Sequence, residues 1–235
     1  MWLALDTATD RASVALSGAR LERSVVGARR HAAALPRLIA ELLSEAGASA
    51  DRLTGVVLAD GPGSFTGLRV GASVAKGLVL AGQLPLRTMP SLLGRAAAAA
   101  VEPGHRIVVV SNALRGEVYA ACYRFPVGQV DVIMPPTVTT IERLTSLEPP
   151  AAIVGDAPPE ALERLAAWAG APVITGEAGA ARAGRLLELF DMPGAATAIA
   201  DVATWEPTYG RPAEAQARWE LSHGRPLPDS VGTAR

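Results

Sequence analysis

The residues that stand out for chemistry lie in a glycine-rich segment, Asp60-Gly61-Pro62-Gly63-Ser64, that follows a short apolar run. Gly61 and Gly63 permit a sharp turn from a strand into a helix, and Ser64 is a good N-cap for that helix. Such a turn is either a structural cap or an anion site, because the free N–H groups of a first helical turn attract negative charge. It is neither a Walker loop nor a nucleophile elbow, since no Gly-Lys-Ser/Thr follows and Ser64 comes directly after Gly63.

Histidine and cysteine are too sparse to predict a metal site or a nucleophile. His31 opens a predicted helix, but Leu35 occupies the position one turn later, so that face offers no second ligand. His31 is therefore interpreted as a helix-terminus or interface residue. Cys122, the single cysteine, lies in an alternating apolar run typical of a buried strand. The sequence predicts no metal, no cofactor and no catalytic residue.

The composition is that of a folded chain with little net charge. Its 235 residues are 49% hydrophobic and 19% charged, which supplies a core and argues against disorder. The formal net charge of -1 gives no basic field that would hold a polyanion. The first residues lack the basic start of a signal peptide, and no apolar stretch reaches about 20 residues, so we predict a cytoplasmic protein without a membrane span.

The elements that must position these residues follow a repeated order. The first unit is predicted to have strands at 3–7, 12–16 and 21–26, a helix at 35–46, a strand at 56–58 and a helix at 65–81. A strand at 84–88 and an alanine-rich helix from Pro90 to about Val101 follow. The second unit is predicted to have strands at 107–110, 118–123 and 130–134, a helix at 141–146, a strand at 153–154, a helix at 158–169, a strand at 173–174 and a helix at 180–190.

A βββαβα unit that occurs twice resembles the two-lobed α/β fold of actin, Hsp70 and the sugar kinases, the ASKHA class. We therefore predict an N-terminal lobe at 1–103 and a C-terminal lobe at 104–203. Pro103-Gly104 marks the boundary between them. A Pro-rich segment and tail, 204–235, follow the second lobe.

The segment Gly61–Gly71, Gly-Pro-Gly-Ser-Phe-Thr-Gly-Leu-Arg-Val-Gly, resembles the hallmark of the TsaB family. Other stretches agree in order: an opening hairpin at 5–15, Arg30-His31 before an amphipathic helix, and a strand-turn at 111–119. Glu206–Pro212 is similar to the closing Pro-x-Tyr-Leu-Arg, with glycine where leucine is usual. On these motifs the chain is identified as a member of the TsaB family over about residues 1–212.

The resemblance implies a partner subunit in tRNA modification. TsaB has the fold of TsaD, which transfers a threonylcarbamoyl group to the adenosine beside the anticodon. TsaB pairs with TsaD, and the ATPase TsaE joins the assembly. The expectation is a non-catalytic subunit that reaches tRNA only through the complex. A small-molecule kinase or ATPase of this fold is the alternative; for an independent hydrolase, neither a nucleophile with a base nor a metal can be assembled.

Asp6, Thr7 and Thr9 are the candidates for binding a nucleotide, because they stand where ATPases of this fold place their first phosphate loop. Such loops usually carry glycine so that the backbone can approach the phosphate, but position 8 is alanine. Gly155-Asp156 is the nearest counterpart in the second lobe. Asp6 is therefore interpreted as a remnant or a structural cap, with nucleotide binding as the alternative.

The partner surface is predicted on the first two helices, where the resemblance places the subunit contact. Gly67, Gly71 and Ala75 are spaced by four and line one stripe. Glycine in a helix costs about 1 kcal/mol relative to alanine, so close approach of another backbone is the expected compensation. That neighbour is either a helix of TsaD or this chain's own sheet. The predicted interface consists of His31, Leu38, Leu42, Gly67, Val70, Gly71, Val74, Ala75 and Leu78. A homodimer through the same patch is the alternative when TsaD is absent.

Overall fold

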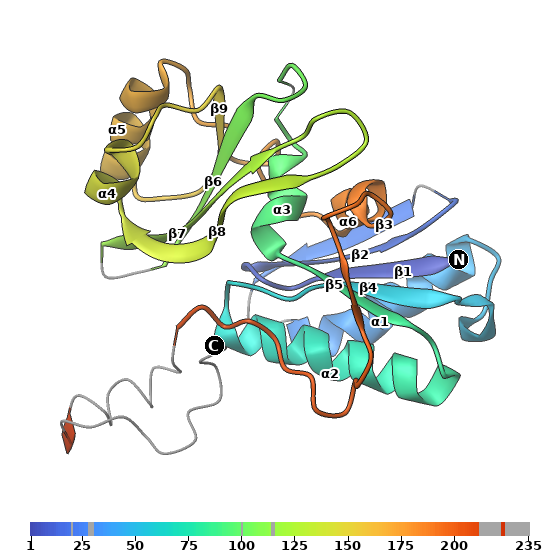
Figure 1. Cartoon of the computed structure of the whole chain (residues 1–235). Coiled ribbons are helices and arrows are strands. Elements are labelled where there is room, and N and C mark those ends of the chain that lie inside the picture. The colour runs from blue at the N-terminus through green and yellow to red at the C-terminus, as the bar shows by residue number, and fades with distance from the viewer. Residues whose placement is uncertain (20, 28–30, 100, 114–115, 212–221, 224–235) are drawn as a thin grey trace.

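Two sheets and their helices form alternating layers (Figure 1). The computed structural model describes residues 1–19, 21–27, 31–99, 101–113, 116–211 and 222–223. The elements in chain order are β1 (Trp2–Asp6), β2 (Arg11–Leu16), β3 (Leu21–Val26), α1 (His31–Glu45), η2 (Ala50–Arg52), β4 (Gly55–Ala59), α2 (Phe65–Gly82), β5 (Leu86–Met89), α3 (Ser91–Ala96), β6 (Arg106–Asn112), β7 (Glu117–Arg124), β8 (Asp131–Thr140), α4 (Ile141–Thr145), β9 (Ala152–Gly155), α5 (Pro159–Ala169), α6 (Ala183–Leu189) and β10 (Thr197–Ile199).

The predicted βββαβα order is present twice. The first sheet has the order β10-β5-β4-β1-β2-β3, and the second has the order β8-β7-β6-β9. In each unit the first strand pairs antiparallel with the second and parallel with the fourth. The strand ends that carry Asp60 and Asp156 therefore occupy equivalent positions in the two units.

The central strands β1 and β4 of the first sheet are apolar on both faces because helices cover both faces. Leu3 and Leu5 of β1 pack towards α1 and α2, whereas Ala4 faces the core that contains α3 and α6. That second core also includes residues of β6, β7 and β9, so α3 and α6 lie between the two sheets. The outer face of the second sheet packs against α4 and α5.

Three details differ from the prediction. The alanine-rich helix ends at Ala96 because Ala98 and Ala99 bond the carbonyls three residues back, which tightens the chain into a turn. The strand predicted at 173–174 is a single bridge from Ile174 to β9. The end of the predicted second lobe returns to the first sheet, where β10 pairs with β5 and α6 packs on β1 and β2. The lobe boundaries stay a prediction.

None of the helices in the described ranges combines the length and the apolar character that crossing a bilayer requires.

Candidate functional site

The glycine turn after β4 lies directly on the loop after β1. The Ser64 N–H donates to the Ala8 carbonyl at 2.7 Å, and Ser64 Oγ accepts from the Gly67 N–H at 3.2 Å. A Cβ on Gly63 would overlap the Ala8 carbonyl, and one on Gly67 would overlap the Thr7 carbonyl. Glycine is therefore required so that two backbone segments can touch. Of the two interpretations of this turn, the structural cap matches the geometry.

The three nucleotide candidates share this loop but differ in exposure. Asp6 and Thr7 are 1% and 0% exposed, while Thr9 is partly exposed. Asp6 Oδ1 accepts from the Ala8 N–H at 3.0 Å, which closes a local turn. Thr9 Oγ1 accepts from the Arg11 N–H at 3.2 Å. The side chains of Asp6 and Thr7 thus support the loop from inside and do not face solvent.

A buried arginine joins the two lobes. Arg95 of α3 is 4% exposed, and its Nε donates to the Gly179 carbonyl at 2.9 Å. Its Nη1 lies 2.6 Å from Asp156 Oδ1, a charge contact and not an aligned hydrogen bond. Burial raises the pKa of Asp6 to about 6, although the Ala8 N–H and the Arg95 charge both act to lower it. The guanidinium therefore contacts a carboxylate of the second unit and acts electrostatically on one of the first.

Sequence reasoning did not identify Arg95, although one signal was available. It is the one charged residue in the apolar run from Leu92 to Val101, and a charge in an apolar helix needs a buried partner. The partner itself was not predictable, because Asp156 belongs to another unit of the chain.

Asp60, at the end of β4, is a second carboxylate with a perturbed pKa. Burial raises the pKa of Asp60 to about 6, although the Thr88 hydroxyl donates a hydrogen bond to it. The Tyr123 hydroxyl is buried without a partner, and burial together with the nearby Asp60 raises the pKa of that hydroxyl. The interior beside α3 therefore carries an uncompensated acidic group.

Replacing Asp60 by asparagine is expected to stabilise the protein at neutral and higher pH. The folded-state pKa of Asp60 is above its ordinary value of 3.8, so between these values the folded state retains a proton that the unfolded state loses. Wild-type stability therefore falls as pH rises from about 4 to 6 and then levels off. Urea unfolding near pH 8 should give Asp60→Asn about 3 kcal/mol more stability, with little difference near pH 4.

Asp51→Asn is the matched control, because Asp51 is exposed and a hydrogen bond from Ser49 lowers its pKa. It should gain no stability at high pH. If the two substitutions changed the free energy of unfolding near pH 8 equally, the proposed cost of burying the Asp60 carboxylate would be contradicted.

The stripe predicted to meet a partner faces this chain's own sheet, so the interface assignment is corrected here. A Cβ on Gly71 would overlap the Thr7 hydroxyl, and Ala75 is 0% exposed. Leu38 and Leu42 of α1 are also buried, in the core between α1, α2 and the first sheet. Together with Gly67, these residues are unavailable to a partner. Val70, Val74 and Leu78 are partly exposed and stay candidates. The side chain of His31 lies outside the described residues.

Gly71→Leu is accordingly expected to destabilise the fold. Overpacking against Thr7 and Leu58 should cost about 1–3 kcal/mol. Gly77→Leu on the same helix is the control, because nothing lies within 4 Å of its Cβ position and leucine favours a helix. Thermal melts of both should show a lower midpoint for Gly71→Leu alone. A melting midpoint for Gly71→Leu equal to that of the wild type would contradict close packing of Gly71 against Thr7.

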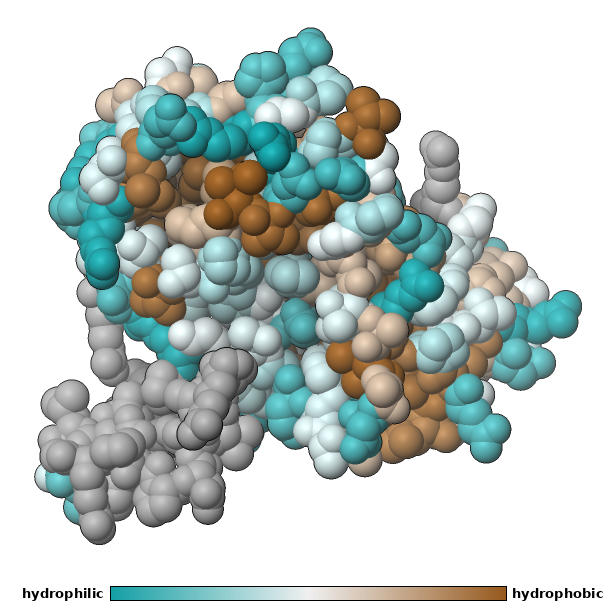
Figure 2. All heavy atoms as spheres, in the orientation of Figure 1, coloured by the Kyte–Doolittle hydropathy of each residue, from teal (hydrophilic) through white to brown (hydrophobic). Residues whose placement is uncertain are grey.

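The outward face of α2 combines small residues with one exposed leucine. Thr66, Ser73 and Gly77 are exposed, and Leu80 is 62% exposed. Figure 2 shows hydrophobic surface at the lower right, where Figure 1 places the C-terminal part of α2. A hollow of about 530 Å³ on this face is lined by Phe65, Thr66, Arg69, Val70, Ser73 and Val74.

Residues 203–211, called the strap below, run along α2 towards its N-terminal end (Figure 1). Lys76 donates to the Ala203 carbonyl at 3.3 Å and lies 3.6 Å from Glu206. Tyr209 is buried against Phe65, with ring centroids 4.7 Å apart. The strap therefore covers one side of α2 and leaves the outward face open.

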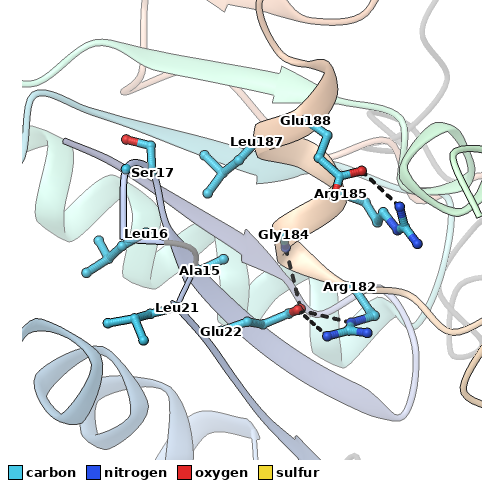
Figure 3. A pocket seen from close by; sticks show the side chains of 11 residues that line it. Ala15, Leu16, Ser17, Leu21, Glu22, Arg182, Gly184, Arg185, Leu187 and Glu188 are labelled. Atoms are coloured by element: carbon cyan, nitrogen blue, oxygen red, sulfur yellow. Dashed lines mark hydrogen bonds and ion pairs between the residues drawn. The ribbon is translucent and has the colours of Figure 1, made fainter. Parts of the chain in front are cut away.

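A groove of about 600 Å³ lies between the β2–β3 hairpin and α6 (Figure 3). Its charged groups pair with one another. Glu22 Oε2 lies 2.7 Å from Arg182 Nη2, and Glu188 Oε2 lies 2.9 Å from Arg185 Nη1. The groove thus lacks, among these residues, an uncompensated charge that would select a ligand.

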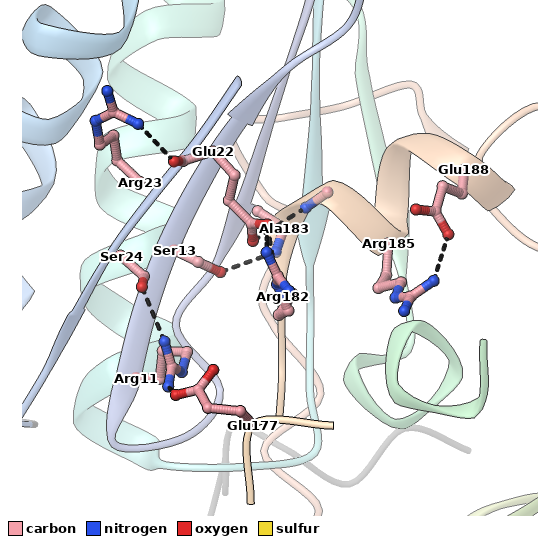
Figure 4. A network of polar contacts seen from close by, with 11 residues as sticks. Arg11, Ser13, Glu22, Arg23, Ser24, Glu177, Arg182, Ala183, Arg185 and Glu188 are labelled. Atoms are coloured by element: carbon pink, nitrogen blue, oxygen red, sulfur yellow. Dashed lines mark hydrogen bonds and ion pairs between the residues drawn. The ribbon is translucent and has the colours of Figure 1, made fainter. Parts of the chain in front are cut away.

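The polar contacts around this groove fasten α6 to the first sheet (Figure 4). Ser13 Oγ accepts from the Ala183 N–H at 2.8 Å, and Arg11 pairs with Glu177. These contacts explain why the chain returns to the first sheet after the second unit.

A metal site was not predicted, and the described residues contain no group of three His, Cys, Asp or Glu side chains that could hold one.

Comparison with known proteins gives one consistent result. The model of the family described as TsaD, tRNA N6-adenosine threonylcarbamoyltransferase, matches residues 25–181. A TsaB, tRNA threonylcarbamoyladenosine biosynthesis protein, from Haemophilus influenzae is 35% identical over 120 residues, 50% of this chain and 51% of that protein. The TsaB of Escherichia coli is 34% identical over 125 residues, 52% and 54% of the two chains. The matched region thus spans about half the length of these curated relatives.

Solved structures agree over most of the chain. A Pseudomonas aeruginosa protein described as similar to the peptidase YeaZ superposes with a TM-score of 0.70 and 27% identity, covering 89% of this chain and 99% of that one. YeaZ from the same organism gives a TM-score of 0.66 at 24% identity over 99% of both chains. The predicted two-lobed fold class is confirmed.

Proposed function

Because the chain belongs to the TsaD family and aligns with its TsaB proteins, we propose that it is a non-catalytic subunit for threonylcarbamoyl transfer to tRNA. The resemblance to TsaB predicted from the sequence is confirmed. In this proposal the chain pairs with a TsaD-like subunit in the cytoplasm, a TsaE-like ATPase joins them, and tRNA is bound by the complex.

The closed loop between β1 and β2 carries this proposal. Gly63 and Gly67 rest on the carbonyls of Ala8 and Thr7, so the turn after β4 packs closely on the loop that was predicted as a phosphate loop. Arg95 contacts Asp156 and acts electrostatically on Asp6, where an ATPase of this fold would need an open cleft. These contacts favour the interpretation that the chain is a binding subunit rather than a small-molecule kinase.

The open face of α2 is the proposed pairing surface. It replaces the predicted stripe of Gly67, Gly71 and Ala75 with the stripe of Ser73 and Gly77, which lies on the opposite side of the same helix. Small residues let a second helix approach closely, and Val70 and Val74 provide apolar contact beside them. A stable pairing would bury on the order of 1,600 Å².

Reconstitution tests the function directly. The TsaD-like and TsaE-like subunits and the enzyme that makes threonylcarbamoyl-AMP are incubated with tRNA, with and without this chain, and modified nucleoside is measured by mass spectrometry. We expect modification only when the chain is present, and no tRNA binding by the chain alone at physiological salt. Equal modification without the chain would refute the proposal.

A further inference from the structure

Arg69 is held in one orientation on the outward face of α2. Its guanidinium carbon lies 4.2 Å from the centroid of the Phe65 ring and 5.8 Å from that of Tyr209. The Tyr209 hydroxyl donates a hydrogen bond to Glu206 at 3.2 Å. Because Tyr209 is 4% exposed and belongs to the strap, the strap fixes the stacked guanidinium before any partner arrives.

The charge of Arg69 is not neutralised by an ion pair within the described residues. By contrast, Lys76 on the same helix lies 3.6 Å from Glu206, and Arg37 on α1 lies 2.6 Å from Glu41. The sequence of α2 contains no acidic residue. The exposed guanidinium thus gives the outward face a positive charge that has no direct ion-pair partner among the residues described.

The guanidinium also borders the hollow beside Val70 and Ser73. An apolar hollow with one fixed cation at its edge matches a helix or loop that carries apolar side chains and a single carboxylate. Arginine presents parallel N–H donors that fit a carboxylate, and a stacked guanidinium loses little conformational freedom on binding. A second copy of α2 would present another arginine at this position, so the charge favours a different protein.

We infer that Arg69 is the electrostatic anchor of the pairing surface and takes an aspartate or glutamate side chain of the TsaD-like subunit. The inference rests on the proposed function, because it names the chemistry of that subunit's contact. Phe65 and Tyr209 hold the Arg69 guanidinium in place. The strap, which carries Tyr209, therefore supports binding by positioning Arg69 and does not itself contact the partner's carboxylate.

The test measures the dissociation constant and association rate for the purified TsaD-like subunit at low and physiological salt. We expect Arg69→Gln to weaken binding about 10-fold to 100-fold and Arg69→Glu more, because a like charge would face the carboxylate. Arg69→Lys keeps the charge but loses the planar fork, so it should fall in between. The affinity of Arg69→Gln should depend less on salt than that of the wild type.

Arg143→Glu is the matched control for Arg69→Glu. Arg143 is exposed on α4 of the second unit, and its replacement changes the net charge by the same amount. It should leave the dissociation constant within about 3-fold of wild type. Circular dichroism and a thermal melt of each variant establish that it is folded.

The outcomes separate the inference from the function on which it rests. Wild-type affinity in a folded Arg69→Glu variant overturns the anchor while leaving the partner role intact. Failure of the wild type itself to bind refutes the partner role. If an Arg69 variant binds the TsaD-like subunit normally but its complex no longer binds tRNA, the inference is overturned and Arg69 contacts a phosphate instead. A change confined to self-association overturns it in favour of a second copy.

Discussion

Gly77→Trp is expected to abolish pairing with the TsaD-like subunit without unfolding the chain. Nothing lies within 4 Å of the Cβ position of Gly77, so a side chain can leave the helix there without an overlap at its base. On the proposed surface the indole would hold a partner helix beyond the 8–10 Å at which helices pack. The dissociation constant should rise by at least about 100-fold, which corresponds to roughly 3 kcal/mol.

Calorimetric titration of the TsaD-like subunit, together with the modification assay at limiting concentrations, measures this effect. Ala167→Trp serves as the control because Ala167 is also a small, exposed helical residue, on α5 of the second unit. That variant should bind and support modification normally. If Gly77→Trp does the same, the pairing surface lies elsewhere on the molecule.

Arg95→Met is expected to cost about 1–3 kcal/mol of stability, the usual loss when a buried hydrogen-bond acceptor is left without its donor. Methionine has a similar length but no charge. The Gly179 carbonyl would lose its donor, and Asp6 would stay buried without its nearby cation. Urea unfolding at neutral pH measures the loss as a lower midpoint at constant slope.

Two further variants establish the cause. Arg164→Met removes a half-exposed arginine that lies 2.6 Å from Glu142, and it should cost no more than about 1 kcal/mol. Adding Asp6→Asn to Arg95→Met should recover part of the loss, because the carboxyl left behind no longer carries a charge. Equal losses for Arg95→Met and Arg164→Met would contradict the cost of removing a buried arginine. Strict additivity with Asp6→Asn would refute a charge interaction between Arg95 and Asp6.

The order of elements was predictable because apolar runs and turn residues mark it locally. Residues that are adjacent in sequence determine both the meander of β1, β2 and β3 and the glycine turn before α2. The return of β10 to β5 was not predictable, because a strand of three residues carries no periodicity and its partner lies far away in the chain.

The small-residue stripe of α2 was predicted to face a partner, but it faces this chain's own sheet. Spacing by four places Gly67, Gly71 and Ala75 on one stripe, yet it places Ser73 and Gly77 on another with equal force. Helix α2 is apolar nearly all round, so its sequence does not reveal which stripe the sheet covers. Only the position of the loop after β1 decides the question, since Thr7 occupies the space beside Gly71.

The return of α6 and β10 means that the first sheet is built from two stretches of chain that are far apart in sequence. A fragment that ends at residue 103 would expose one edge of β5 and the inner face of β1 and β4. During synthesis, the earliest part of the chain therefore cannot complete its sheet until residue 199 has left the ribosome. The sheet whose strands are synthesised first is therefore the sheet that is completed last.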